Sequence, residues 1–346
     1  MIYTRRDLGK MALATVPMAS ALAKVNSKFH GVQIGAITYS FRAMTSDVDE
    51  LIKAMVQLGL GEAELMSNSV EAAAGAPGSQ GQGGAGRGAG GGPGGGARGA
   101  APPDAAAQGR GPGRGPGGGR GQMTPEQQAA MRARTEELRK WRLSVSMDKF
   151  KDVRKKFSKA GIDLALLCFN MQDSMTDEEV DYAFQMAKAL GAKAITTSTT
   201  VSMSKRIAPV ADKHKMLIGY HGHDQTSDPN QFATLESYAT AFGYGKYNGV
   251  NLDIGHFTAS NYDAIAFIKE HHARITNLHV KDRKKDHGPN TPWGQGDTPI
   301  KEVLQLLRKN KYPFPANIEL EYPIPQGSDV MTEMAKCLKF CKDALA

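Results

Sequence analysis

The sequence predicts an α/β protein in which eight parallel strands close into one (β/α)8 barrel. Short apolar runs alternate with longer amphipathic stretches, an order typical of strand–helix units in a parallel sheet. Eight such units occur, which is the number that closes a barrel. No Gly-x-Gly-x-x-Gly sequence follows the first run, and this disfavours an open doubly wound sheet.

The predicted elements follow from periodicity and from helix start and stop signals. The strands are expected within residues 32–40, 61–67, 162–170, 192–200, 216–223, 249–257, 275–282 and 316–322. The helices are expected within residues 47–59, 147–161, 177–191, 204–215, 231–243, 262–273, 299–310 and 330–345. Thr176 and Glu179 have the spacing of a capping box, while Gly59, Gly161 and Gly191 follow helical runs.

The composition suits a single domain without a nucleic-acid partner. The 346 residues are 40% hydrophobic, which is enough for one sizeable core. The formal charge is +8, of which residues 1–23 carry +2 and residues 72–122 carry +4. The barrel is therefore nearly neutral and lacks the basic balance expected of a nucleic-acid enzyme.

Residues 1–23 predict an export signal. Arg5 and Arg6 form a twin arginine, a short apolar stretch follows, and Ala21-Leu22-Ala23 fits a cleavage site. The apolar stretch is too short for a membrane span. The motif resembles a twin-arginine translocation signal, which implies a folded protein exported to the periplasm. An ordinary secretory signal or a retained anchor is the alternative.

A low-complexity segment interrupts the predicted barrel, which spans residues 24–346. Residues 72–122 are rich in Gly, Ala, Pro and Arg, and predict a disordered insertion after the second strand. A helix that begins near Pro125 follows the insertion. The chain has 3 cysteines, too few for a disulfide framework.

Ionisable side chains gather where the predicted strands end, and the C-terminal ends of barrel strands form the active-site rim. Four consecutive strands contribute, and the second strand adds a carboxylate. The candidates are Glu64, His221, His223, Asp253, His256, His279, Lys281, Glu319 and Glu321. We expect His221, Asp253, His279 and Glu319 to bind one divalent metal ion, with Glu321 as the alternative to Glu319. This nitrogen and oxygen set suits Mn, Zn, Co, Fe or Ni better than calcium.

The motifs around these residues are "GYHGHD", "VNLDIGHF", "LHVKD", "WGQGD" and "IELEY". In this order they resemble the sugar phosphate isomerase/epimerase family of xylose isomerase-like TIM barrels, which includes ketose epimerases, hydroxypyruvate isomerase, inosose dehydratase and endonuclease IV. The epimerases hold their metal with Glu, Asp, His and Glu. Here His221 stands in place of the first Glu, a departure that resembles the branch near inosose dehydratases and keto-glycoside lyases.

The resemblance and the residues together predict a sugar isomerase, epimerase, lyase or dehydratase that abstracts an α-proton through a metal-stabilised enediolate. The acid and base candidates are His223, His256, Lys281 and Glu321. The substrate-contact candidates are Glu64, Tyr39 and Trp293. A non-phosphorylated sugar, keto-sugar or glycoside is expected as substrate. The sequence leaves open the sugar, the metal, isomerisation or elimination, and whether the chain forms a homo-oligomer.

Two other classes of function remain as alternatives. A metal-free sugar-binding barrel would use the same polar rim without a cation. An endonuclease IV-like enzyme would require about three metal ions and more ligands than these strands supply. The nearly neutral barrel disfavours this second alternative.

Overall fold

The computed structural model describes residues 25–78 and 124–346, and these form the predicted closed barrel. Eight parallel strands pair side by side, and pairing of the first with the second completes the ring. They are β2 (Val32–Ile37), β3 (Glu62–Met66), β4 (Asp163–Cys168), β5 (Ala194–Thr197), β6 (Leu217–His221), β7 (Asn248–Asp253), β8 (Ile275–Val280) and β11 (Ala316–Ile318). Seven lie within the predicted ranges, and β7 begins one residue before its range. A short strand, β1 (Lys28–Phe29), adds to β2 in antiparallel orientation.

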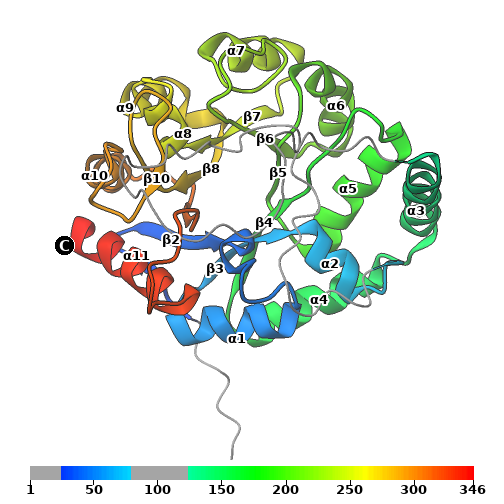
Figure 1. The fold of residues 1–346 in the computed structure, drawn as a ribbon, viewed down its shortest axis with the longest axis horizontal. Helices are drawn as coiled ribbons and strands as arrows, with labels where there is room; N and C mark the ends of the chain where they lie inside the picture. The colour runs from blue at the N-terminus through cyan, green and yellow to red at the C-terminus, as the bar shows by residue number, and fades with distance from the viewer. Residues whose placement is uncertain (1–24, 79–123) are drawn as a thin grey trace, which may run out of the picture.

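Helices surround this ring, as Figure 1 shows. They are α1 (Val48–Leu58), α2 (Ser67–Ala73), α3 (Pro125–Ser144), α4 (Asp148–Lys159), α5 (Asp177–Leu190), α6 (Val201–His214), α7 (Leu235–Tyr244), α8 (Ile254–Ala259), α9 (Ala264–His271), α10 (Ile300–Asn310) and α11 (Val330–Leu345). The predicted helices are confirmed, but α2 and α8 are additional. Because α8 begins directly after Asp253, His256 lies on a helix and not at the end of a strand.

Local signals explain where the main helices begin and end. The Asp47 side chain accepts hydrogen bonds from two backbone N–H groups in the first turn of α1. Thr176 and Glu179 form the predicted capping box at the start of α5. Gly59 and Gly191 end their helices with φ of 75°, a conformation that glycine adopts without steric cost. These signals fix the lengths of the helices and hence the positions of the strand ends.

The loop of the "WGQGD" motif is held by a carboxylate. Short strands β9 (Asp282–Arg283) and β10 (Asn290–Thr291) pair antiparallel beyond β8. The Asp282 side chain accepts hydrogen bonds from the backbone N–H groups of Gly294, Gly296 and Thr298, at 2.8, 2.9 and 3.2 Å. A Cβ atom at position 296 would lie 2.0 Å from Asp282 Oδ1, so this close approach requires glycine.

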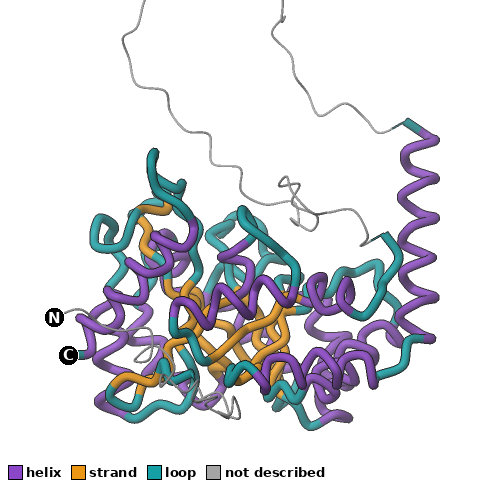
Figure 2. Tube along the Cα trace, turned by 90° about the horizontal axis from the view of Figure 1, so that it is seen from below, coloured by secondary structure: helices purple, strands orange, loops and turns teal. Residues whose placement is uncertain are grey.

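Helix α3 is anchored at its C-terminal end. Arg142 pairs with Glu71 at 2.7 Å and with Glu179 at 3.1 Å, and its side chain is only 10% exposed. No residue of α3 is buried, and Figure 2 shows its first part standing clear of the barrel at the right of the view. This one buried cluster therefore connects α3 to α2 and α5.

Two sequence predictions fall mainly outside the described residues. The proposed export signal, residues 1–23, lies wholly outside them. Of the insertion predicted at residues 72–122, only 72–78 are described; its first two residues end α2. No described helix is long and apolar enough to cross a membrane.

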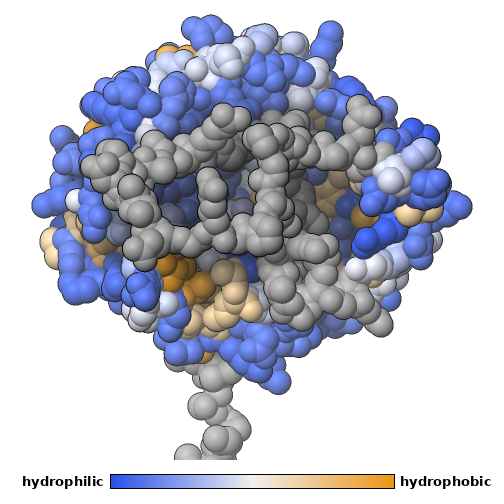
Figure 3. All heavy atoms as spheres, in the orientation of Figure 1, coloured by the Kyte–Doolittle hydropathy of each residue, from blue (hydrophilic) through white to orange (hydrophobic). Residues whose placement is uncertain are grey.

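The apolar side chains form one main core between the strands and the surrounding helices. Cys168, Cys337 and Cys341 are buried, and all three thiols are free. Figure 3 shows that most of the described surface in this orientation is hydrophilic. Apolar burial between the barrel and its helices is the main source of stability in such a fold.

Candidate active site

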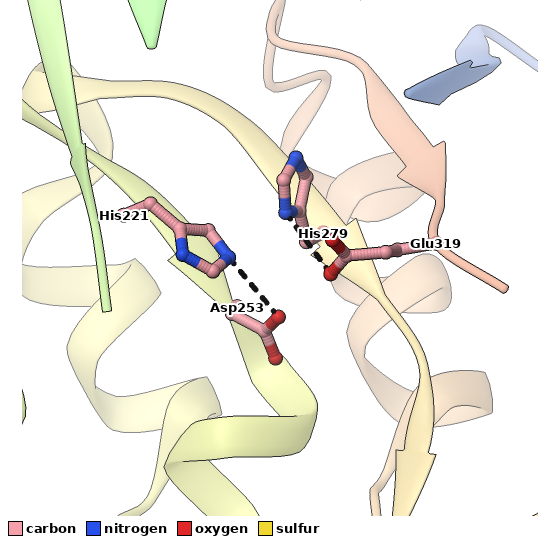
Figure 4. Close-up of side chains that lie close together, drawn as sticks. All are labelled: His221, Asp253, His279 and Glu319. Atoms are coloured by element: carbon pink, nitrogen blue, oxygen red, sulfur yellow. Dashed lines mark ion pairs between the residues drawn. The ribbon is translucent and has the colours of Figure 1, made fainter. Parts of the chain in front are cut away.

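Four side chains of the metal-ligand type converge at one end of the barrel. His221 ends β6, Asp253 ends β7, His279 lies on β8, and Glu319 follows β11 directly. One potential ligand atom from each lies within 4.8 Å of the others, and all four residues are buried. Figure 4 shows these side chains facing a common space. We call this group the quartet.

The turn after β7 orients one member of the quartet. Asp253 is the N-cap residue of α8, and its Oδ1 atom accepts a hydrogen bond from the backbone N–H of His256 at 2.7 Å. The other carboxylate oxygen, Oδ2, then faces His221 Nε2 at 3.4 Å. One oxygen thus stabilises the helix while the other remains for the site.

The quartet passes a test of fit for a metal ion. His221 Nε2 and His279 Nδ1 are buried and make no well-directed hydrogen bond within the described residues, and each faces a carboxylate oxygen, of Asp253 at 3.4 Å and of Glu319 at 3.2 Å. Leaving a buried polar atom unpaired costs about 1–3 kcal/mol, and here two such nitrogens face two carboxylates across one space. Imidazole nitrogens and carboxylate oxygens are ligands for divalent transition metals. The four residues could therefore bind a metal ion.

Lys281 lies beside the quartet and neutralises part of its charge. Its Nζ atom is 2.8 Å from Asp253 Oδ2, 2.9 Å from Glu319 Oε2 and 2.6 Å from Glu321 Oε2. Burial lowers the pKa of Lys281, but these three carboxylates raise it by more, so that the net pKa lies well above its usual value. Lys281 is therefore an ammonium ion here. The quartet includes Glu319, whereas Glu321 lies beyond Lys281.

His223 and His256 form the wall of the site next to His221. The ring centroids of His221 and His223 are 4.8 Å apart, and those of His223 and His256 are 5.3 Å apart. Burial lowers the pKa of His223, and positive charge at His221, His256 and Lys281 lowers it further, well below its usual value. The His223 residue is half-buried, whereas His221 is buried.

An arginine determines which nitrogen of His256 carries a proton. Arg283 Nη1 lies 2.6 Å from His256 Nδ1, and a guanidinium can only donate, so Nδ1 accepts and Nε2 carries the proton of the neutral ring. Asp224 pairs with Arg283 at 2.9 Å. Burial raises the pKa of Asp224, but its hydrogen bond and ion pair with Arg283 contribute to a larger lowering. The sequence pattern assigns no role to Asp224 or Arg283.

Glu64 occupies a different position from the one expected for a sugar contact. It lies in the middle of β3, not at its end, and it is 0% exposed. Its carboxylate accepts hydrogen bonds from Thr196 Oγ1 at 2.5 Å, Asn277 Nδ2 at 2.8 Å and Asn317 Nδ2 at 3.1 Å. His279 Nε2 lies 2.8 Å from the same carboxylate. Glu64 therefore supports His279 from below, out of reach of a substrate at the rim.

Glu64 and His279 each stabilise the charged form of the other. Burial raises the pKa of Glu64, but positive charge on His279 and the hydrogen bonds to the carboxylate lower it by more. Burial lowers the pKa of His279, yet the charges of Glu64 and Glu319 raise it well above its usual value. The ring is thus held between two carboxylates, with Nε2 toward Glu64 and Nδ1 toward Glu319.

The spacing of three asparagines from the quartet residues could have identified them in the sequence as neighbours of the site. Each lies two positions before a quartet residue: Asn251 before Asp253, Asn277 before His279 and Asn317 before Glu319. Because strand side chains alternate, both members of each pair face the barrel interior.

Of the two aromatic candidates, only Tyr39 has an electrostatic link to the site. Burial raises the pKa of Tyr39, Arg42 lowers it, and the charges of Glu321 and Glu319 raise it further. Trp293 instead packs edge-on against Phe340 of α11, with ring centroids 5.8 Å apart. Its indole Nε1 is buried, with no hydrogen-bond partner among residues 25–78 and 124–346.

Comparison with known proteins places this site in a family context. The model of the xylose isomerase-like TIM barrel family matches residues 129–341, more than half of the chain. No curated protein matches the chain.

Solved structures share the fold at low sequence identity. The 3-keto-D-glucoside 4-epimerase YcjR from E. coli, in its apo form, is 10% identical, with a TM-score of 0.54 over 90% of this chain and 100% of that one. The probable 3-DHS dehydratase AsbF from Bacillus anthracis is 12% identical, with a TM-score of 0.54 over 89% and 98%. An IOLI protein with a bound zinc atom is 14% identical, with a TM-score of 0.53 over 91% and 98%.

Proposed function

This chain belongs to the xylose isomerase-like TIM barrel family, and we propose that it is a divalent-metal-dependent enzyme acting on a non-phosphorylated sugar, keto-sugar or glycoside. The reaction begins with removal of a proton next to a carbonyl group. The quartet carries this proposal, because two buried imidazole nitrogens without a well-directed hydrogen bond in the described chain face two buried carboxylates. The epimerase and dehydratase among the structures of the same fold support the reaction class.

In this proposal the metal is bound by His221, Asp253, His279 and Glu319. A divalent ion there supplies Lewis-acid stabilisation of the negative charge that develops beside a carbonyl when its α-proton leaves. The ion is Mn, Zn, Co, Fe or Ni, which the mixed nitrogen and oxygen donor set suits.

The neighbouring residues handle the proton. His223 is the base, because its ring lies next to the quartet and its lowered pKa leaves the ring neutral, with a nitrogen that can accept a proton. His256 is the acid, since Arg283 holds its Nδ1 as an acceptor and leaves the proton on Nε2. Lys281 offers a buried ammonium between the quartet and Glu321. Tyr39 contacts the sugar at the rim.

Two outcomes follow proton removal. Return of the proton to the same or a neighbouring carbon gives epimerisation or isomerisation. Loss of a substituent from the β-carbon gives dehydration or release of an alcohol from a glycoside. His256 is suited to either outcome, because its Nε2 proton can pass to carbon or to a leaving oxygen.

Export by a twin-arginine signal at residues 1–23 belongs to the same proposal. It would place the enzyme in the periplasm, where phosphorylated sugars are scarce. Fractionation of cells that express the full chain tests this location, with Arg5→Lys and Arg6→Lys as a paired variant that retains the protein in the cytoplasm.

Proton exchange tests the reaction directly. The metal-loaded protein is incubated with keto-sugars in deuterium oxide, and the carbon next to the carbonyl is followed by NMR. We expect deuterium to enter there, and His223→Gln to slow the exchange by roughly 10²- to 10⁴-fold. The control His272→Gln, an exposed residue ahead of β8, should leave the rate unchanged. Exchange into sugar phosphates alone would contradict the proposed substrate class.

One observation favours a second candidate. The Lys281 ammonium already lies within 2.9 Å of two quartet carboxylates, so the site holds a positive charge of its own. A metal-free sugar-binding barrel would use this ammonium in place of a metal ion. Sugar binding that is unaffected by a chelator, with no proton exchange, would favour this candidate.

A further inference from the structure

A second buried carboxyl group lies deeper in the barrel than Glu64. Glu62 precedes Glu64 by two positions on β3, so both side chains point into the barrel. Glu62 is only 2% exposed, and neither of its carboxyl oxygens has a hydrogen-bond partner in the described chain. An ionised carboxylate with no partner is among the most costly groups to bury. Glu62 therefore requires a physical explanation.

The space around Glu62 is shaped by Gly35. A Cβ atom at position 35 would lie 1.6 Å from Glu62 Oε2 and 2.8 Å from Asn317 Oδ1. The Glu62 carboxyl and the Asn317 carbonyl oxygen therefore occupy the same small space, which exists because residue 35 has no side chain.

The orientation of the Asn317 amide is fixed from the other side. Its Nδ2 atom donates a hydrogen bond to Glu64 Oε2 at 3.1 Å. Reversing the amide would turn its oxygen toward the Glu64 carboxylate, which can only accept. Asn317 Oδ1 must then face Glu62, and it too has no hydrogen-bond donor. Two acceptors face each other, an arrangement that is favourable only if Glu62 carries a proton.

We infer that Glu62 is a neutral carboxylic acid that donates a hydrogen bond to Asn317 and completes a chain of positioning residues leading to His279. The chain runs from the Glu62 hydroxyl to Asn317 Oδ1, from Asn317 Nδ2 to Glu64, and from Glu64 to His279 Nε2. It turns His279 Nδ1 toward the quartet. The link to metal binding rests on the proposed function, whereas the protonation of Glu62 does not.

Burial and charge agree with this inference. Burial raises the pKa of Glu62, and the negative charges of Glu64 and Asp163 raise it further, while Lys193 and the side chain of Asn317 lower it by less. The net pKa lies well above the usual value. A neutral acid also avoids placing a second negative charge beside Glu64.

Three variants separate the roles of the chain. Glu62→Gln keeps the size of the side chain and a donor for Asn317 Oδ1. Glu62→Leu removes the donor but fills the space. Glu64→Gln removes the negative charge that faces His279. Each variant is titrated with Co²⁺, whose visible absorption reports the affinity and the ligand geometry, and circular dichroism confirms that each variant is folded.

We expect Glu62→Gln to bind Co²⁺ within about twofold of the wild-type affinity and with the same spectrum. Loss of a residue that supports a metal ligand weakens binding by roughly 10- to 100-fold. We therefore expect Co²⁺ binding to weaken by about 10-fold in Glu62→Leu and by about 100-fold in Glu64→Gln. If Glu62→Gln binds as weakly as Glu62→Leu, an ionised Glu62 is needed and the inference is wrong. Equal Co²⁺ affinity in all variants would show that these residues do not support His279, and would also overturn the inference.

Infrared spectroscopy tests the proton itself. The wild-type protein at neutral pH should show the C=O stretch of a protonated carboxylic acid, and Glu62→Gln should lack it. Absence of this band from the wild-type protein would overturn the inference. If the wild-type protein binds no Co²⁺, the proposed function fails, and the infrared band still decides whether Glu62 is neutral.

Discussion

At the scale of single residues, glycine and lysine explain the polar interior of the barrel. Gly35 leaves the space in which the Glu62 carboxyl and Asn317 lie. Lys281 pairs with three carboxylates that would otherwise repel one another. Neither residue needs to contact a substrate to affect the site, so both can be tested through stability.

Gly35→Ala should destabilise the protein by about 1–3 kcal/mol, because the new methyl group would collide with Glu62 and Asn317. Gly243→Ala is the matched control. A Cβ atom there meets nothing within 4 Å, and the residue lies in α7, so alanine should be neutral or slightly stabilising. Denaturant unfolding of both variants makes the comparison. Equal stability would show that the space at Gly35 is not needed.

Lys281→Met should destabilise the metal-free protein by about 3–5 kcal/mol, because it leaves buried carboxylates without their cation. Divalent metal should restore most of the loss, since a cation bound by the quartet again faces Asp253 and Glu319. Thermal unfolding with and without Zn²⁺ measures both effects. A loss of stability that Zn²⁺ does not reduce would contradict a metal site at the quartet.

At the scale of elements, four of the eight strands, β6, β7, β8 and β11, present a quartet residue at or beside their C-terminal ends, and a turn holds one of these residues in place. Asp253 shows this most clearly, because one carboxylate oxygen caps α8 and the other faces His221. Helix α3 is held differently, through the buried cluster of Arg142, Glu71 and Glu179.

Arg142→Met should destabilise the protein by about 3–5 kcal/mol, because it leaves the buried Glu71 without its arginine partner and Glu179 with Arg139 alone. The control is Lys151→Met in α4, which breaks an exposed pair with Asp148 and should change little. Denaturant unfolding gives the two differences. Amide hydrogen exchange should also show α3 opening more often in the Arg142 variant. Similar stability of the two variants would mean that the cluster does not anchor α3.

The strands and the quartet could be predicted from the sequence because both follow from simple periodicities. Apolar runs locate the strands, and parallel strands bring their C-terminal ends to one rim. The alternation of side chains also places Lys281 beside Glu319 and Glu321. Each of these inferences needs only the residue pattern within a strand and the rule that the C-terminal ends of parallel strands share one rim.

The contacts that could not be predicted depend on depth within the barrel and on chain reversals. Glu64 reads as a strand-end carboxylate, but β3 continues to Met66 and buries it. His256 reads as part of a strand, but Asp253 caps a new helix there. Arg283 lies on β9, which pairs antiparallel with β10 beyond the end of β8, and from there it reaches His256.

At the scale of the whole molecule, the barrel interior is polar from its lower layer to its rim. Glu62 lies beside Asn317 next to Gly35, hydrogen bonds lead from Asn317 through Glu64 to His279, and Lys281 connects the quartet to Glu321. Because the outer core between strands and helices is apolar, the fold can support this polar interior.

The most direct test is elemental analysis of the purified protein together with His221→Ala and Asp253→Ala. We expect about one Mn, Zn, Co, Fe or Ni ion per chain in the wild-type protein and none in either variant, with both variants folded by circular dichroism. Wild-type protein that retains no divalent metal, even after reconstitution, would contradict the central claim that the quartet is a metal site.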